Sequence, residues 1–469
     1  MYKKLSIANF KGFSGQHEIE LAPITLLYGA NSAGKSAILE SLLLLSQSIR
    51  QASVSAEGAM EPLVFAGKNV DLGGFHATVN GHNLSKSIEL GLTYEIGKGE
   101  SIDEESFEVA INWDHHLSRS VLESCIYSIK SVPENTVTFR RNRTSPSNSS
   151  VTAIADDGLK NVARIVAQSA NRKLPNPQEL DATILKIMSE SQYQNWSFLP
   201  GIKPLERPDN HEEKTKEELL EFFGKDLSHR EWRSMLEDRF FSTRKKLISI
   251  RYIGPLRKSP TRIEPLVEHQ ATYVGNDGQG VASILYKAPE AVIKVNSYLT
   301  RMGIPYEVHV KRVDSEASGT LGELIAIQLV DKRSNVVLSM EDVGFGISQI
   351  LPLLVQLAVS KNNLVVIEQP ELHLHPAIQA NFGDLLIEGV SSADRTQFLI
   401  ETHSEHLLLR LQRRIRSGEL NSQSVAVYYV DAVENSGSGV LRLEMDKNGE
   451  FLTPWPNGFF PERIDEILS

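Results

Sequence analysis

The chain has 469 residues, a formal net charge of −10 and a single cysteine, Cys125. A chain of this length is too long for a single hydrophobic core, so we expect two or three domains or subdomains. Its content of 41% hydrophobic and 23% charged residues is typical of a soluble globular protein. One cysteine excludes an intrachain disulfide framework, and without a signal core or a run near eighteen apolar residues we expect a cytoplasmic protein that does not enter a membrane. The acidic balance argues against a protein that coats nucleic acid, but leaves a local basic groove open.

Residues 1–30 are predicted to form strands that lead into a glycine-rich loop, G-A-N-S-A-G-K-S at 29–36, followed by a helix over 36–51. Strand, glycine loop and helix form the context in which G-x-x-x-x-G-K-[ST] binds phosphate. The two glycines let backbone N–H groups point at an anion, the lysine can reach the β- and γ-phosphates, and the serine hydroxyl can ligate Mg²⁺. We therefore predict that ATP is held by Gly29, Asn31, Ser32, Ala33, Gly34, Lys35, Ser36 and Ala37, with Ser36 also on the metal.

Two apolar–polar alternations follow, at residues 88–96 and 107–113, with the polar stretch 97–105 between them. This pattern predicts a long β-hairpin with one buried face, in an antiparallel subdomain. Farther along the chain, alternation at 306–310 and 325–329 predicts two more strands, and the apolar residues at 425–430 and 441–443 predict a further two.

Residues 134–247 have a different character, with a breaker-rich loop and then helical apolar spacing among many charges of both signs. We interpret them as a mainly helical insertion, whose role in dimerisation, nucleic-acid contact or partner docking the sequence leaves open. The most basic stretch follows at 244–262. It is compatible with binding a phosphate backbone and equally with facing the acidic insertion; its cations are Arg244, Lys245, Lys246, Arg251, Arg257, Lys258 and Arg262.

The apolar run 364–367 ends in a carboxylate, Glu368. A carboxylate at the carboxyl end of a buried strand beside a phosphate loop is where such enzymes hold Mg²⁺. We therefore predict that Glu368 and Ser36 form the metal site.

The residues that follow, Q-P-E-L-H-L-H-P at 369–376, resemble the Walker B region of ABC-type ATPases of the OLD, RecF and SMC-like branch of AAA-family ATPases. N-F-K-G-F at 9–13 is similar to that branch's first strand, T-H-S at 402–404 to its switch-histidine loop, and V-G-F-G-I-S-Q at 343–349 to its signature loop. The tail W-P-N-G-F-F at 455–460 looks like that of a prokaryotic subgroup. The resemblance implies an α/β ABC-ATPase-like P-loop head with an antiparallel β subdomain and a mainly helical insertion.

The resemblance also implies roles for individual residues. Lys11 would contact ATP. The signature loop would touch the γ-phosphate of the opposite subunit through Gly344, Gly346 and Ser348. This loop reads V-G-F-G-I-S-Q, which departs from the usual L-S-G-G-Q. Members usually place a glutamate after the Walker B acid as the base that activates water, whereas this chain has Gln369, whose amide cannot accept that proton.

Three alternatives follow from Gln369. Glu371 serves as the base instead, His403 orients the water, or the protein is an ATP-held clamp that hydrolyses very slowly. We favour slow hydrolysis that uses Glu371.

In the resembling family two heads close head-to-tail over two nucleotides, which implies a homodimer or a larger even assembly. OLD relatives carry a C-terminal Toprim nuclease, but only 49 residues follow Leu420 here (469 − 420), so we expect the effector, a nuclease or toxin, to be a separate protein in anti-phage defence. The alternative is a RecF-like, ATP-gated DNA repair clamp. The expected organisation is an N-terminal ATPase part at 1–133, the insertion at 134–247, a C-terminal ATPase part at 248–430 and a short tail at 431–469.

Overall fold

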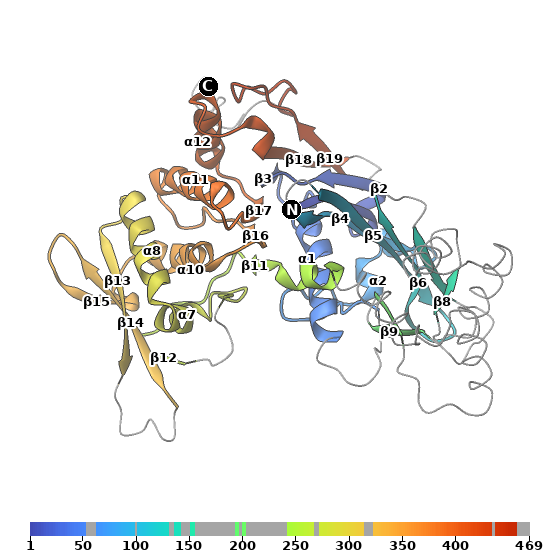
Figure 1. Ribbon diagram of the computed structural model, residues 1–469, viewed down its shortest axis with the longest axis horizontal. Coiled ribbons are helices and arrows are strands. Elements are labelled where there is room, and N and C mark those ends of the chain that lie inside the picture. The colour runs from blue at the N-terminus through green and yellow to red at the C-terminus, as the bar shows by residue number, and fades with distance from the viewer. Residues whose placement is uncertain are drawn as a thin grey trace, which may run out of the picture. The chain divides into compact units, whose positions relative to one another are not determined.

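The computed structural model describes residues 1–52, 62–98, 101–130, 136–141, 151–154, 193–196, 199–202, 242–266, 272–313, 322–433 and 437–456 (Figure 1). The chain divides into two compact units. The first combines Met1–Glu20 with Glu40–Ser249, and the second combines Leu21–Leu39 with Ile250–Ser469.

The first unit is built on an antiparallel sheet with the strand order β2-β1-β4-β5-β6-β7-β8-β9-β10. Its strands are β1 (Tyr2–Phe10), β2 (Phe13–Glu20), β4 (Ile88–Lys98), β5 (Ser101–Asp114), β6 (Arg119–Ile129), β7 (Val137–Arg141), β8 (Val151–Ile154), β9 (Tyr193–Trp196) and β10 (Leu199–Ile202). Helix α2 (Phe75–Thr78) and the short helix η1 (Asn80–His82) lie between β2 and β4 in the chain.

The predicted hairpin is confirmed as β4 and β5, which pair from Ile88 with Ile111 to Lys98 with Ser101. The alternating residues form its buried face: Ile88, Leu90, Leu92, Tyr94, Phe107, Val109 and Ile111. The predicted polar connection was too long, because the two strands take up most of 97–105. Backbone hydrogen bonds between antiparallel strands do not require apolar side chains, so the pairing continues as far as Lys98 and Ser101.

The described residues of 134–247 include the four strands β7 to β10 and a helical segment at 242–249. The remainder lies outside the described residues, so the mainly helical insertion stays a prediction. Cys125, on β6, is fully buried, and burial raises the pKa of its thiol to about 12.

The second unit contains a mainly parallel sheet with the order β19-β18-β3-β17-β16-β11. Its strands are β3 (Ile24–Gly29), β11 (Arg251–Ile253), β16 (Leu364–Glu368), β17 (Gln397–Glu401), β18 (Val425–Val433) and β19 (Gly437–Leu443). Only β19 runs antiparallel to its neighbour. The β-branched and leucine-rich runs of β3, β16 and β17 are buried, as expected of central parallel strands. Their carboxyl ends therefore lie at one edge of the sheet.

Helices pack on this sheet, and a smaller antiparallel sheet lies beside them (Figure 1). The helices are α1 (Lys35–Ala52, which continues into the first unit), α7 (Val281–Lys287), α8 (Pro289–Arg301), α10 (Phe345–Val359), α11 (Pro376–Ser391) and α12 (Glu405–Arg416), with the short η3 (Met340–Asp342) and η4 (Ser422–Ser424). The smaller sheet holds β12 (Glu264–Pro265), β13 (Tyr306–Val313), β14 (Leu324–Asp331) and β15 (Val337–Ser339), so the alternation at 306–310 and 325–329 correctly predicted strands. In the part of the chain that the structure describes, no helix combines the length and the apolar character needed to span a membrane.

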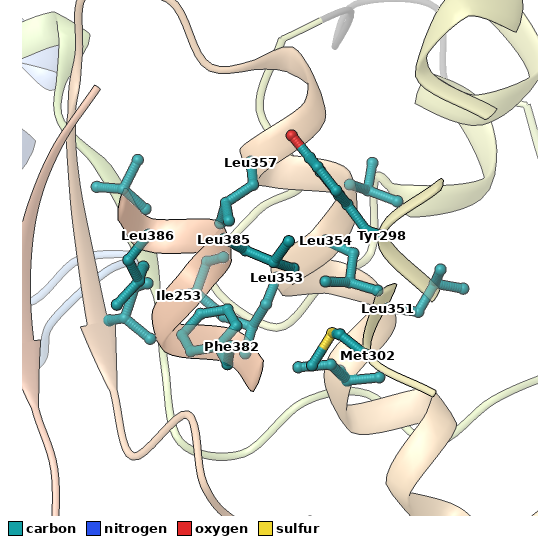
Figure 2. Close-up of a cluster of buried hydrophobic side chains, with 14 of the residues drawn as sticks. Ile253, Tyr298, Met302, Leu351, Leu353, Leu354, Leu357, Phe382, Leu385 and Leu386 are labelled. Atoms are coloured by element: carbon teal, nitrogen blue, oxygen red, sulfur yellow. The ribbon is translucent and has the colours of Figure 1, made fainter. Parts of the chain in front are cut away.

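The core of the second unit lies where α10 packs between its neighbours (Figure 2). Leucines of α10 meet Phe382 and two leucines of α11 on one side, and Tyr298 and Met302 on the other. The labelled α10 and α11 leucines, Leu351, Leu353, Leu354, Leu357, Leu385 and Leu386, are all buried. This packing fixes the helices that follow the signature-like loop and β16, and so the loops that precede them.

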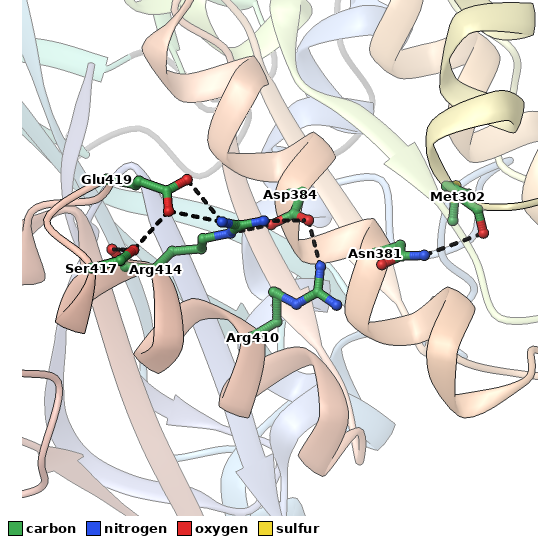
Figure 3. A network of polar contacts seen from close by, with 7 residues as sticks. All are labelled: Met302, Asn381, Asp384, Arg410, Arg414, Ser417 and Glu419. Carbon is green, nitrogen blue, oxygen red and sulfur yellow. Dashed lines mark hydrogen bonds and ion pairs between the residues drawn. The ribbon is translucent and has the colours of Figure 1, made fainter.

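A polar network joins α11 to α12 (Figure 3). The Asp384 carboxylate accepts hydrogen bonds from Arg410 Nη1 at 2.5 Å and Arg414 Nε at 2.8 Å, and Arg414 also pairs with Glu419 at 2.8 Å. Asn381 donates to Met302 O at 3.2 Å, which ties α11 to the end of α8. Burial raises the pKa of Asp384, but the Arg414 and Arg410 guanidiniums lower it by more, so its pKa lies below the ordinary value.

Replacing Asp384 with Asn should lower the free energy of unfolding by about 1–3 kcal/mol at pH 7, because two guanidiniums lose their carboxylate. Because the pKa of Asp384 is lowered in the folded state, its contribution is complete above the ordinary aspartate pKa and is lost as the pH falls through the lowered value. Urea unfolding at several pH values measures this. The control Glu450→Gln removes an exposed pair with Arg416 and should cost less than about 1 kcal/mol. A difference between wild type and Asp384→Asn that grows toward acid contradicts the prediction.

Candidate nucleotide site

The glycine loop begins at the last residue of β3 and ends where α1 starts, as the sequence predicted. Gly29 has φ of +135°, and a Cβ there would lie 1.9 Å from the Val430 carbonyl oxygen on β18. Gly34 has φ of +113° and Ser32 has φ of +62°. Gly29 and Gly34 thus adopt backbone conformations that side chains strongly disfavour, and the loop can curl around an anion.

Lys35 lies inside this loop with only 3% of its surface exposed. Its Nζ donates hydrogen bonds to Gly29 O at 2.9 Å and Ala30 O at 2.7 Å. Burial lowers the pKa of Lys35, while the charges of Glu401 and Glu371 oppose that effect. A cation is therefore placed at the loop, next to two carboxylates, where a triphosphate would need it.

Four oxygen-bearing side chains gather at the edge of the sheet. Ser36 Oγ donates to Glu401 Oε2 at 2.8 Å, and Glu401 is paired in register with Glu368 across β17 and β16. The Tyr252 hydroxyl donates to Glu368 Oε1 at 2.8 Å. Hydroxyl and carboxylate oxygens are the ligands that Mg²⁺ prefers, so the residues present fit this metal.

Glu401 is a candidate that the sequence reasoning missed. The sequence held a signal for it, because the apolar run 398–400 ends in the acid Glu401, as the run before Glu368 does. Only the alignment of the two strands shows that both acids reach the same edge.

The chain reverses direction directly after β16. Gln369 has φ of +44°, an uncommon value for a residue with a side chain, and its N–H donates to Glu401 O at 2.8 Å. This turn directs Glu371 toward the loop after β17. There Glu371 Oε2 accepts from Thr402 Oγ1 at 2.7 Å, and Oε1 accepts from the His403 N–H at 2.6 Å.

Burial raises the pKa of Glu371, against hydrogen bonds from His403 and Thr402. His403 is an exposed residue, and partial burial together with the charge of Lys35 lowers its pKa, so the imidazole is neutral at pH 7. The structure therefore joins Glu371 and the switch loop directly, which spacing in the sequence did not predict.

The three signature residues lie at the start of α10, beside the loop that follows β16. A Cβ on Gly346 would lie 2.8 Å from His373 O, and the Phe345 and His373 rings meet edge to face with centroids 5.0 Å apart. Gly344 precedes the helix, whereas Ser348 is buried and its Oγ donates to Phe345 O at 2.7 Å. Their predicted contact with the γ-phosphate of another subunit stays a prediction.

Two other predicted groups have different surroundings. Lys11 belongs to the first unit, where its Nζ pairs with Glu40 at 2.5 Å, and its role toward ATP stays a prediction. Within the basic stretch of the second unit, Arg262 pairs with Glu341 and Asp342, and Lys258 with Glu264. Two of the seven cations of the stretch are thus paired with acids, which lowers the charge they would offer to a phosphate backbone.

The described part of the tail packs against the strand that leads into the glycine loop. The Trp455 ring meets Tyr28 at a centroid distance of 5.5 Å, and also Tyr429 and Phe451. The Tyr28 hydroxyl donates to Ser404 O at 2.9 Å, in the loop that carries His403. Residues 457–460 of the W-P-N-G-F-F motif lie outside the described residues.

A parallel sheet with a glycine loop, its lysine and serine, and carboxylates at the ends of neighbouring strands defines a P-loop ATPase of mixed α/β fold. The model of the AAA ATPase domain family matches residues 1–408, and the chain belongs to this family.

Solved structures with a similar fold include SMC heads. One is the SMC head bound to the C-winged helix domain of ScpA (14% identity, TM-score 0.43, covering 95% of this chain and 98% of that one). A second is the SMC head domain from Thermotoga maritima, with 13% identity and a TM-score of 0.39, covering 95% of this chain and 99% of that one. A third is the SMC head domain with an extended coiled coil bound to the C-terminal domain of ScpA, from Pyrococcus furiosus, with 14% identity and a TM-score of 0.41, covering 100% of this chain and 98% of that one. A search of curated proteins found no match to this chain.

Proposed function

We propose that this ATPase hydrolyses ATP slowly, with Glu371 as the base, and that ATP-driven dimerisation of the heads controls a separate effector in anti-phage defence. The observation that carries the catalytic part is the convergence of Lys35, Ser36, Glu368 and Glu371 at the carboxyl ends of β3, β16 and β17. Ligands of open α/β sheets bind at this edge.

Each residue has a distinct role in this proposal. The loop N–H groups and Lys35 hold the β- and γ-phosphates, and Ser36 and Glu368, joined by Glu401, hold Mg²⁺. When bound, Mg²⁺ neutralises charge that develops on the phosphates. Glu371 accepts the proton of the attacking water, and the neutral His403 imidazole orients that water.

Slow turnover follows from the surroundings of Glu371. Gln369, directly after Glu368, has an amide that cannot accept a proton. Both carboxylate oxygens of Glu371 already accept hydrogen bonds, from Thr402 and from the His403 backbone. These hydrogen bonds hold the carboxylate toward the loop after β17, so it must release one of them before it can turn toward the attacking water.

Assembly and partner are proposed on the resemblance of the motifs to the OLD, RecF and SMC-like branch. One surface feature agrees with it: Phe345, at the start of α10, is 46% exposed beside the exposed His373. We propose that this face meets the nucleotide of a second copy, which gives a homodimer or a larger even assembly. The nuclease or toxin that it controls is a separate chain.

Single-turnover hydrolysis with Mg²⁺, with light scattering on the same samples, tests the proposal. We expect the dimer to form with ATP and to dissociate as the ATP is cleaved. ATP that is bound and released uncleaved would leave an ATP-held clamp in place of an enzyme. A monomer at every stage of the reaction would contradict the assembly while sparing the catalytic part.

Binding of duplex DNA tests the RecF-like alternative on the same protein. A clamp of that kind loses affinity steeply as salt is raised. Because Lys258 and Arg262 are paired with acids, we expect only weak binding.

A further inference from the structure

A buried arginine lies directly behind the turn that carries Glu371. Arg257, in the loop after β11, is only 5% exposed. Its Nη2 donates to Glu368 O at 2.9 Å and, more weakly, to Gln369 O at 3.4 Å. Its Nε and Nη1 are buried without a hydrogen-bond partner among the residues that the structure describes.

This arrangement is costly, because a buried cation with unpaired N–H groups has lost its hydration. Burial lowers the pKa of Arg257 to about 10, and the charges of Glu371 and Glu368 oppose that effect. The group thus remains a cation at pH 7, and its charge interacts with those of the two carboxylates. An ordinary core position would be filled better by an apolar side chain.

The backbone that Arg257 holds is itself strained. Gln369 has φ of +44°, in the left-handed region that side chains disfavour, and this conformation persists only where the surroundings impose it. The Gln369 N–H is bonded to Glu401 O on β17, and the carbonyls of Glu368 and Gln369 are bonded to Arg257 on the other side. The turn is therefore held between β17 and the loop after β11.

We propose that Arg257 is a positioning residue for hydrolysis: it fixes the turn after β16, and so the place of the Glu371 carboxylate, and its charge favours the ionised carboxylate. This inference rests on the proposed role of Glu371 as the base. Among the described residues, Glu371 also interacts with Lys35 at the start of α1, with Tyr28 on β3, and with His403 after β17.

Two substitutions separate the two effects. Arg257→Met keeps much of the volume but removes the charge and the hydrogen bonds, whereas Arg257→Lys keeps the charge and loses the planar fork. For Arg257→Met we expect kcat to fall on the order of 10²-fold, with KM and ATP affinity within about twofold of wild type, because misplacing a reacting group costs rate more than binding. The acidic limb of the rate profile should also move to higher pH.

Arg257→Lys should return the acidic limb to its wild-type position while kcat stays low. Arg416→Met is the matched control, because it removes an exposed arginine that pairs with Glu450, and it should leave the rate and the profile unchanged. Wild-type kcat in Arg257→Met would overturn the proposal. A collapse of ATP affinity together with melting temperature in both variants would also overturn it, in favour of a purely structural role.

An infrared titration of the Glu371 carboxylate, assigned by difference against Glu371→Gln, does not depend on turnover. We expect its pKa to rise in Arg257→Met, and an unchanged value would overturn the electrostatic part. If wild type does not hydrolyse ATP at all, the proposed function fails, whereas the infrared titration still decides whether Arg257 acts on Glu371.

Discussion

Replacing Glu371 with Gln should lower the single-turnover rate of ATP hydrolysis on the order of 10²–10⁴-fold, which is typical of losing a general base. ATP affinity should be nearly unchanged, because the phosphates are held by the glycine loop and Lys35. The amide keeps the size of the side chain and can still accept one hydrogen bond from Thr402 or His403, so the fold should persist. Rapid-quench measurement of radiolabelled phosphate release gives the rate.

The pH dependence of the wild-type rate should also show whether Glu371 is the general base. Burial raises the pKa of Glu371, and only the ionised carboxylate accepts a proton from water. The rate should therefore fall as the pH drops through a value above the ordinary glutamate pKa, and this limb should be absent from the residual activity of Glu371→Gln. Glu450→Gln, at an exposed ion pair, is the control and should match wild type. If Glu371→Gln hydrolyses ATP at the wild-type rate, another group is the base.

Gly29→Ala should destabilise the protein by about 3 kcal/mol or more and abolish ATP binding, since a new methyl group and a disfavoured φ act together. The added Cβ would lie 1.9 Å from Val430 O, which belongs to the paired backbone of β18 and cannot retreat without breaking the ladder. Chemical unfolding and fluorescent-nucleotide titration measure the two effects.

Gly344→Ala is a suitable stability control for this glycine. No atom lies within 4 Å of a Cβ built at Gly344, and its φ of −58° is ordinary, so its unfolding free energy should change by less than about 0.5 kcal/mol. Equal stability of Gly29→Ala and wild type would contradict the close approach of β3 and β18.

Much of the nucleotide-binding unit could be predicted because its signals are local. The apolar run before the glycine loop and the leucine-rich segment after it located β3 and α1 to within a residue at each end, and the run at 364–367 located β16. The fold class followed from the resemblance of the glycine loop and the Walker B region to those of ABC-type ATPases. Periodicity and glycine spacing need no knowledge of the rest of the chain.

The parts that were missed depend on which strands become neighbours. Glu401 reaches Ser36 only because β17 lies between β16 and β3, an order that chain sequence does not reveal. Arg257 was grouped with the cations of the basic stretch, expected to meet a phosphate backbone or the acidic insertion, yet the pairing of β11 with β16 places it in a buried loop. Likewise, the hydrogen bonds of Glu371 come from a loop more than thirty residues away along the chain.

The two hydrogen bonds between Glu371 and the loop of His403 couple the movement of the base to that of the loop. The carboxylate cannot turn toward a water without releasing Thr402 or the His403 backbone, so the base and the switch histidine must rearrange in one concerted step. Under the proposed function, the lifetime of the ATP-bound assembly is then set by how often this loop opens, and less by the intrinsic reactivity of the phosphate. Helix α12 begins at Glu405, two residues after His403, so a partner that binds this helix can raise or lower the rate at which the loop opens.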